Sequence, residues 1–256
     1  MKASSIPSHE KSFFKNGKDS LGKQFNIIPE SINIGDGTLL DYMYCERVNK
    51  DDSFYYKETI PKTKIVLHFT AGYLKGDLAQ LTIPSNHVSV PFVIARNGTV
   101  IKLWSSQYWS YHLGRGAIGG NTTMSKQTIG IELSNIGYLR KKGSNLVSSY
   151  SETDIYCGLN ETLLYEKLTT PYRGEEYFAS FTQKQYDSLA LLLKYLTHTY
   201  NIPMQFMPED KRYDTLSKNE VENFNGILSH VNYRNSGKWD IGEAFDWNKL
   251  ITAVNM

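Results

Sequence analysis

The chain has 256 residues, which is enough for one sizeable hydrophobic core, or for one core and a small appendage. Hydrophobic residues make up 40% of the chain and charged residues 21%, and the net charge of +2 is too mild to indicate nucleic-acid binding. The 18 tyrosines fit either a tyrosine-rich surface and core or a groove that binds carbohydrate or peptide.

Residues 1–60 are polar and irregular, and their pattern predicts no helix. Turn-forming residues stand at 16–17 and 35–37, so we expect an N-terminal extension that partly covers the main domain. The first residues lack the apolar segment of a secretory signal, and no window reaches the roughly 18 apolar residues of a membrane span. Cys45 and Cys157 leave open two free thiols or one disulfide.

Short apolar runs begin at residue 64 and predict β-strands. Residues 65–69 read Ile-Val-Leu-His-Phe, as expected for a central strand that is buried on both faces. Residues 90–95 and 100–104 predict a hairpin around the Asn-Gly pair at 97–98. Pro91 indicates an edge strand or a bulge, because proline cannot donate a ladder hydrogen bond.

Residues 128–134 alternate between apolar side chains and small or polar ones, as a strand does. The apolar side chains share one face, and the other face carries Gly130, Glu132 and Ser134. Glu132 therefore lies between two small residues, which leaves space above it for another group.

The second half of the chain predicts helices after a long insertion. Residues of about 138–180 are polar, and we treat them as this insertion. Residues 182–200 predict a helix with one apolar face, and Thr182 and Gln185 match a capping box at its start. A second helix is predicted at about 217–228. Strands followed by helices favour an α/β fold with a central mixed sheet flanked by helices.

Three residues are candidate metal ligands. His68 ends the predicted strand at 65–69, His230 follows the predicted second helix, and Asp240 lies ten residues beyond it. Spacing alone leaves both a metal site and ordinary packing open, because the chain has no HExxH motif.

Several segments occur in an order that resembles one known family. They are HFTAG (68–72), VSVPFVIARNGTVIKLW (88–104), WSYHLG (109–114), IGIELSN (129–135), and GILSH with KWDIG within 226–242. Together they are similar to the zinc amidases that include bacterial N-acetylmuramoyl-L-alanine amidases, phage lysins and animal peptidoglycan recognition proteins. The resemblance covers about 64–252, with the insertion as its main irregularity.

This resemblance implies a peptidoglycan recognition protein/amidase-like fold. It divides the chain into an N-terminal extension at 1–60 and a zinc amidase domain at 61–256, with the insertion at about 138–180. The family binds zinc through a strand-end histidine, a later histidine and a nearby cysteine or aspartate. These positions correspond to His68, His230 and Asp240, so we expect one zinc ion per chain. Such a donor set leaves an open fourth position for water.

The resemblance also implies two catalytic residues. Glu132 matches the glutamate that is the general base in the cytoplasmic recycling branch of the family, where it moves a proton from water to the departing amine. Lys238 matches a lysine that points at the substrate carbonyl and stabilises its oxyanion. His112 and Trp109 match the region near the groove, where substrate contact and core packing both remain open.

One departure from the family concerns catalysis. Many relatives carry Tyr-His or His-Tyr where this chain has Val90-Pro91-Phe92, so the tyrosine that assists phage enzymes is absent at this position. The chemistry would then depend more on Glu132.

The implied function is zinc-dependent hydrolysis of the amide bond between N-acetylmuramic acid and L-alanine, in peptidoglycan or its soluble muropeptide fragments. One alternative is a peptidoglycan-binding module without hydrolysis, and another is a zinc enzyme for an unrelated amide. Because a typical signal is lacking, we expect a cytoplasmic enzyme, or one that reaches the cell wall or periplasm by a non-classical route or as a trimmed form. The expected partner is peptidoglycan or a muropeptide, with no nucleic acid and no membrane span; the oligomeric state is left open.

Overall fold

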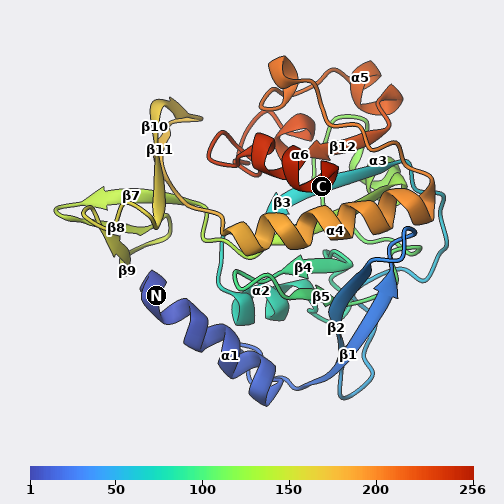
Figure 1. Ribbon diagram of the computed structural model, residues 1–256, viewed down its shortest axis with the longest axis horizontal. Helices are drawn as coiled ribbons and strands as arrows, with labels where there is room; N and C mark the ends of the chain where they lie inside the picture. Colours follow the sequence, from blue (N-terminus) through green and yellow to red (C-terminus); the bar gives the residue numbers. More distant parts are fainter.

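The short apolar runs form inner strands of a seven-stranded sheet in the computed structural model, which describes residues 1–256 (Figure 1). The strand order is β1-β2-β5-β4-β6-β3-β12. The strands are β1 (Phe25–Asn33), β2 (Leu39–Arg47), β3 (Lys64–Phe69), β4 (Phe92–Ile94), β5 (Val100–Lys102), β6 (Thr128–Leu133) and β12 (Gly226–Ser229). Antiparallel pairs β1/β2 and β4/β5 combine with parallel pairs elsewhere, so the predicted mixed sheet is confirmed.

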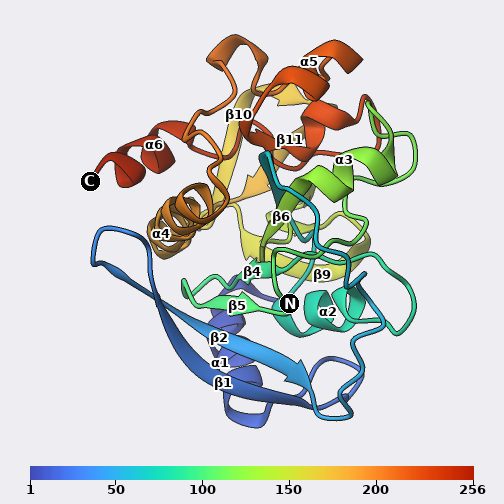
Figure 2. The same ribbon diagram turned by 90° about the vertical axis from the view of Figure 1, so that its right-hand side faces the viewer.

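Helices cover both faces of this sheet. They are α1 (Ile6–Asn16), α2 (Leu74–Leu81), α3 (Asn121–Gln127), α4 (Gln183–Tyr200), α5 (Lys218–Asn223) and α6 (Trp247–Asn255). Helix α4 crosses one face, and α2 lies on the other (Figures 1 and 2). Strand β4 contributes side chains to both faces of the sheet, because successive side chains of a strand alternate. Phe92 and Ile94 enter the core under α4, whereas Val93 packs on the opposite face with Leu74 and Leu78 of α2.

The predicted helix at 182–200 is confirmed as α4. Thr182 is its N-cap, and the capping box is formed because Gln185 N donates to Thr182 Oγ1 at 3.2 Å and Thr182 N donates to Gln185 Oε1 at 3.1 Å. Asn201 ends the helix in the left-handed region at φ +52°.

The predicted helix at 217–228 is wrong in its second half. Helix α5 starts after Ser217 with a capping box, but it ends at Asn223, and residues 226–229 form the parallel edge strand β12. Gly226 has φ +142°, which a helix does not allow, and a Cβ there would lie 2.3 Å from Gln205 O. His230 therefore follows a strand and not a helix.

The proline prediction is also corrected. Strand β4 is internal, between β5 and β6, and is neither an edge strand nor a bulge. Pro91 stands one residue before Phe92, where a ladder hydrogen bond is not required of its nitrogen, and its carbonyl accepts from Leu103 N at 2.9 Å.

The first 60 residues contain regular structure that the sequence pattern did not predict. Helix α1 buries Ile6 and Phe13 against the body of the protein, and strand β2 pairs in parallel with β5. The hairpin β1–β2 thus extends the central sheet (Figure 2). The division of the chain at residue 60 stays a prediction.

The insertion folds into a second, five-stranded antiparallel sheet, which forms a lobe beside the main sheet (Figure 1). Its strands are β7 (Tyr138–Lys142), β8 (Asn145–Ser148), β9 (Ser151–Gly158), β10 (Tyr165–Tyr172) and β11 (Glu175–Ala179). A small apolar cluster that includes Leu139, Leu146 and Tyr156 joins it to Ile6 of α1.

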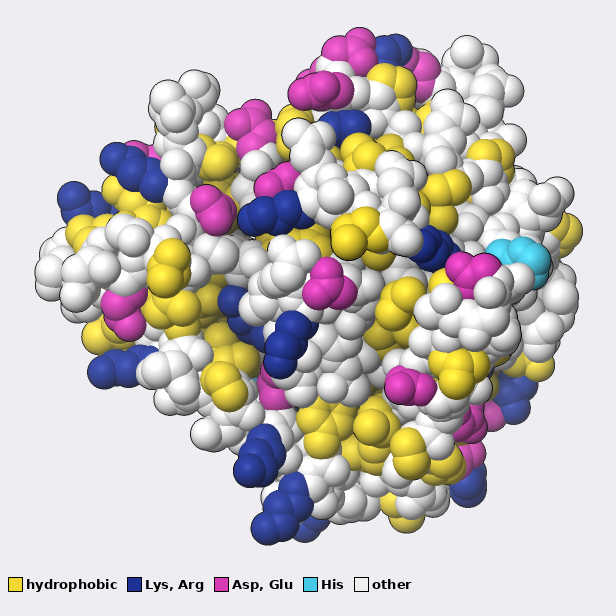
Figure 3. Space-filling model, viewed as in Figure 1, with side chains coloured by type: hydrophobic (Ala, Val, Ile, Leu, Met, Phe, Trp, Pro, Cys, Tyr) yellow, Lys and Arg dark blue, Asp and Glu magenta, His cyan; other side chains and the backbone are white.

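Cys45 and Cys157 are both buried and unpaired, and burial raises the pKa of each thiol, to about 12 and about 11 respectively. None of the helices combines the length and hydrophobicity that a membrane crossing requires. On the face seen in Figure 3, acidic and basic side chains are interspersed.

Candidate metal centre

Two parallel strands place a histidine beside a glutamate. In the β3/β6 register His68 is opposite Glu132, and the apolar neighbours of both residues enter the core under α4. Because side chains alternate along a strand, His68 and Glu132 project from the other face. Both residues lie near the carboxyl ends of their strands, where the sheet opens to a cavity.

The other two predicted ligands reach this position through β12. Strand β12 runs parallel to β3 with Ser229 opposite Leu67, so the next residue, His230, arrives beside His68. His230 then begins a short 3-10 helix, His230–Tyr233. Val231 N donates to Asp240 O at 2.9 Å, which closes the following loop and returns Asp240 to the two histidines.

Three donor atoms of these residues form a compact triangle. His68 Nδ1 lies 2.9 Å from His230 Nδ1 and 3.0 Å from Asp240 Oδ2, and His230 Nδ1 lies 2.8 Å from the same carboxylate oxygen. All three residues are buried. The structure therefore brings together the three predicted metal ligands, which are remote in the chain.

A series of hydrogen bonds determines which nitrogen of His68 carries the proton. Thr128 Oγ1 donates its only proton to Met124 O at 2.8 Å, so it must accept from His112 Nε2 at 2.7 Å. In neutral His112 the Nδ1 atom then accepts from His68 Nε2 at 3.0 Å. The Nδ1 atom of a neutral His68 is consequently unprotonated.

His230 has the same tautomer for a different reason. Its Nε2 atom lies 2.9 Å from Leu113 O, and a carbonyl oxygen can only accept, so Nε2 carries the proton and Nδ1 of the neutral ring has a free lone pair. Two nitrogen lone pairs and a carboxylate oxygen would repel one another at about 3 Å without a cation between them. The site therefore fits a metal ion with two imidazole ligands and one carboxylate ligand.

The ionisation of the ligands favours the same conclusion. Burial lowers the pKa of His68 to about 4, against the opposing effect of its hydrogen bond with Asp240, so this imidazole is neutral at pH 7. Burial alone would raise the pKa of Asp240, but the adjacent His230 and His68 outweigh burial and hold it below its usual value. A neutral imidazole and an ionised carboxylate are the forms that bind metal.

Glu132 faces the cavity beside the three ligands. The cavity measures about 340 Å³, and its lining includes His112, Glu132, His230, Lys238 and Asp240. The Oε2 atom of Glu132 is buried and has no hydrogen-bond partner. Burial raises the pKa of Glu132 well above its usual value, the charge of Asp240 adds to this, and Lys238 opposes it.

His112 lies under the metal ligands, in the space above a glycine. A Cβ at Gly130 would lie 3.1 Å from His112 Cγ and 2.6 Å from Val90 Cγ1. The small residue beside Glu132 thus makes room for this imidazole. Burial lowers the pKa of His112 well below its usual value, and the neighbouring imidazole of His68 adds to the effect.

Trp109 lies away from the cavity lining. Its ring stacks on Tyr56 at 4.3 Å, and its indole N–H donates to Glu58 Oε2 at 2.8 Å. The sequence pattern does not predict that the insertion contributes to the cavity. Tyr138 and Tyr150 line it, and the Tyr150 hydroxyl donates to Ala71 O. No motif marks these tyrosines, because an insertion has no counterpart in the family pattern.

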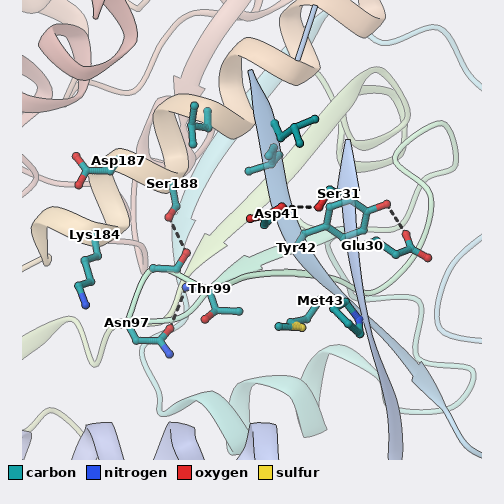
Figure 4. Close-up of a pocket in the computed structure, with 15 residues that line it drawn as sticks. Glu30, Ser31, Asp41, Tyr42, Met43, Asn97, Thr99, Lys184, Asp187 and Ser188 are labelled. Carbon is teal, nitrogen blue, oxygen red and sulfur yellow. Dashed lines mark hydrogen bonds between the residues drawn. The ribbon is translucent and has the colours of Figure 1, made fainter. Parts of the chain in front are cut away.

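A larger cavity, of about 720 Å³, lies between hairpin β1–β2, the β4–β5 turn and α4 (Figure 4). Several of its polar side chains already bond to neighbours: Tyr42 donates to Glu30, Ser31 donates to Asp41, and Ser188 Oγ donates to Gly98 O at 2.6 Å. None of the predicted site residues lines it, so the smaller cavity at the metal ligands is the candidate functional site.

Known proteins resemble the chain over most of this region. Residues 58–243 match the family model for N-acetylmuramoyl-L-alanine amidase. The chain is 26% identical over 196 residues to the N-acetylmuramoyl-L-alanine amidase AmiD of Escherichia coli (strain K12), covering 74% of this chain. The match covers 52% of that relative, so the chain spans about half of its length.

Solved structures also match the chain, and two of them are complexes with muramyl peptides. One is the complex of Escherichia coli AmiD with anhydro-N-acetylmuramic acid-L-Ala-D-gamma-Glu-L-Lys, at 23% identity and a TM-score of 0.48, over 77% of this chain and 59% of that one. The other is AMPDH3 from Pseudomonas aeruginosa in complex with an anhydromuramic pentapeptide, at 16% identity and a TM-score of 0.45, over 77% and 61%.

The mixed sheet brings two histidines and an aspartate together at the edge of a cavity, an arrangement that could hold a metal ion. The family match extends over most of its length and contains all of these residues. The chain belongs to the N-acetylmuramoyl-L-alanine amidase family, and the resemblance stated from its motifs is confirmed.

Proposed function

We propose that the protein is a zinc-dependent amidase that hydrolyses the bond between the lactyl group of N-acetylmuramic acid and the first L-alanine of a stem peptide. The observation that carries this proposal is the convergence of His68, His230 and Asp240 beside Glu132, whose buried Oε2 atom has no hydrogen-bond partner. Family membership supports the amide bond and the muramyl substrate class.

Zinc is the proposed ion because two imidazoles and one carboxylate suit it and leave one position open. When bound, zinc would supply Lewis acidity to the attacking water and to the amide carbonyl. The residues of the chain do the rest: Glu132 takes a proton from the water as its oxygen bonds to the amide carbon, and returns it to the alanine nitrogen as the C–N bond breaks. A carboxyl whose pKa burial has raised suits both transfers.

Lys238 is proposed to stabilise the negative charge that develops on the carbonyl oxygen. It lines the same cavity as Glu132, and it is close enough to counter the effect of burial on the pKa of that carboxyl. The products are the free lactyl carboxylate of the sugar and a peptide with a free amino terminus.

The decisive experiment measures metal content and amide cleavage on the same samples. Wild-type protein should contain one zinc ion per chain and release peptide from anhydro-N-acetylmuramic acid-L-Ala-D-gamma-Glu-L-Lys, and His68→Ala and Asp240→Asn should lose both properties. Tight binding without cleavage would indicate a recognition module instead, and equal cleavage of ordinary dipeptides would indicate a different substrate class. Iron in place of zinc would refute the assignment of the ion, because this donor set also binds Fe²⁺.

A further inference from the structure

An arginine occupies the turn between β10 and β11 in an unfavourable backbone conformation. Tyr172 pairs with Glu175, so Arg173 and Gly174 form a two-residue hairpin turn, with φ of +49° and +86°. Such turns favour Asn, Asp or Gly at the first position, because a side chain is strained in the left-handed region. The side chain of Arg173, and not its backbone, must account for its presence there.

The guanidinium of Arg173 donates to three carbonyl groups of a single loop. Nη1 donates to Lys238 O at 2.7 Å and to Arg234 O at 2.9 Å. Nη2 lies 3.5 Å from Val231 O and 3.3 Å from Thr215 Oγ1. This loop, residues 231–239, is the segment that joins the ligands His230 and Asp240. One planar group with donors in fixed directions therefore holds the whole loop.

Backbone and aromatic contacts add to this attachment. Trp239 Nε1 donates to Arg173 O at 3.2 Å, so the turn and the loop exchange hydrogen bonds in both directions. Tyr172 OH donates to Tyr213 O at 3.1 Å. A Cβ on Gly242 would lie 2.6 Å from the Tyr172 ring, which shows how closely the turn is packed against the chain beyond Asp240.

The position of Lys238 depends on this loop. Its side chain lines the metal-site cavity and has no hydrogen bond that would orient it, whereas its carbonyl oxygen accepts the shortest bond from Arg173. The backbone of Lys238 therefore determines where its side chain points, and Arg173 of the insertion holds that backbone from outside the cavity.

We propose that Arg173 is a positioning residue that fixes the loop of residues 231–239 and directs Lys238 at the substrate carbonyl. This inference rests on the proposed amidase function. It makes the insertion an integral part of the active centre, although it lies outside the family's motifs.

Arg173→Met tests the proposal, because methionine keeps the aliphatic volume and removes every donor. We expect unchanged zinc content and thermal midpoint, with kcat lowered about 10-fold to 100-fold and a much smaller change in KM, as for a misplaced catalytic group. The kcat of Arg173→Lys should lie between those of the wild type and Arg173→Met. Guanidinium ion at low millimolar concentration should restore part of the lost kcat of Arg173→Met. Lys141→Met, which removes a positive charge from an exposed position of the same sheet, is the matched control and should behave like the wild type.

Hydrogen exchange gives a readout that is independent of catalysis. Amides of residues 231–239 should exchange faster in Arg173→Met, while those of β3 should not change. If wild type cleaves no muramyl amide, the proposed function fails, and this comparison still tests the role of Arg173. Unchanged exchange with kcat equal to the control would overturn the inference. A lower kcat that accompanies a loss of zinc or a lower thermal midpoint, and that guanidinium does not restore, would also overturn the inference. The role of Arg173 would then be merely structural.

Discussion

At the proposed metal site, the direction of each hydrogen bond matters as much as the identity of the proposed ligands. A neutral His68 can bind a cation through Nδ1 only if its proton is on Nε2. His112 Nδ1 accepts a hydrogen bond from His68 Nε2 and so holds the proton there. Burial keeps His112 neutral, and its one ring proton is on Nε2, which donates to a threonine whose own proton is already committed, so Nδ1 is free to accept. Such outer partners tune ligand orientation and metal affinity.

Replacing His112 should therefore weaken zinc binding although the residue is not a ligand. We expect His112→Phe, which cannot accept, to raise the zinc Kd about 10-fold to 100-fold. His112→Asn, whose amide oxygen can replace Nδ1 as acceptor, should have a smaller effect. Competition titration with a zinc-chelating dye measures both, with His198→Asn on the exposed side of α4 as the control. An unchanged Kd for His112→Phe would contradict the hydrogen-bond assignment.

Glu132→Gln separates metal binding from proton transfer. The amide keeps the shape of the side chain but cannot accept a proton, so kcat should fall about 100-fold to 10,000-fold while zinc content stays at the wild-type level. Glu152→Gln, at an exposed carboxylate of β9, should leave both quantities unchanged. Turnover at the wild-type rate in Glu132→Gln would remove this residue from the mechanism.

The sequence identifies some site residues and not others for a physical reason. His68 and Glu132 stand at fixed positions in short strands, so their motifs carry their geometry with them. Arg173 and Tyr150 lie on turns of the insertion, and their contacts depend on how two sheets pack, which no local pattern encodes. The role of Trp109 in substrate contact stays a prediction, and its observed partners are Tyr56 and Glu58.

At the scale of elements, the predictions hold where length and periodicity agree. Helix α4 has 18 residues, one apolar face and a capping box, and the sequence predicts it closely. The four residues of β12, Gly-Ile-Leu-Ser, fit a strand as well as a helix turn, and pairing with the neighbouring strand β3 decides between the two. The sequence does not predict helix α1, because only two of its buried side chains, Ile6 and Phe13, are apolar and the rest of the helix is mostly polar.

Strand β6 offers a test of the space that a glycine provides. In Gly130→Ala the new methyl would meet Val90 and displace the His112 ring, which should cost about 1–3 kcal/mol of stability and also raise the zinc Kd. Gly76→Ala is the matched control, because nothing lies within 4 Å of its Cβ and alanine favours the helix. Chemical denaturation and zinc titration of the two variants give the comparison; a Gly130→Ala variant as stable as the wild type would exclude this packing.

At the scale of the whole molecule, a buried carboxyl of α2 should make stability depend on pH. Asp77 accepts from Ser134 Oγ at 2.8 Å, and burial raises its pKa from 3.8 to about 7, with hydrogen bonds from Ser134 and Thr70 opposing burial and Glu10 of α1 adding to it. The folded protein therefore retains this proton where the unfolded chain has released it, and stability falls as pH rises from about 4 to 7.

Asp77→Asn should remove that part of the pH dependence. Each unit of pKa difference corresponds to about 1.4 kcal/mol, so the stability of the variant relative to wild type should improve from pH 4 to pH 8. Denaturant unfolding at a series of pH values measures this difference, with Asp187→Asn on the exposed side of α4 as a control. A constant difference across the range would show that Asp77 titrates normally.

The parallel pairing of β2 with β5 has a practical consequence for anyone who shortens the chain. Cutting it to the family-matched residues 58–243 would leave the β5 amides and carbonyls that face β2 without partners, although β5 would stay paired with β4. It would also uncover the apolar surface that Leu40 and Tyr42 now cover. An unpaired edge strand of this kind can pair with strands of other molecules. Protein trimmed to residues 58–243 should therefore tend to aggregate, and fusion tags are better joined to all 256 residues.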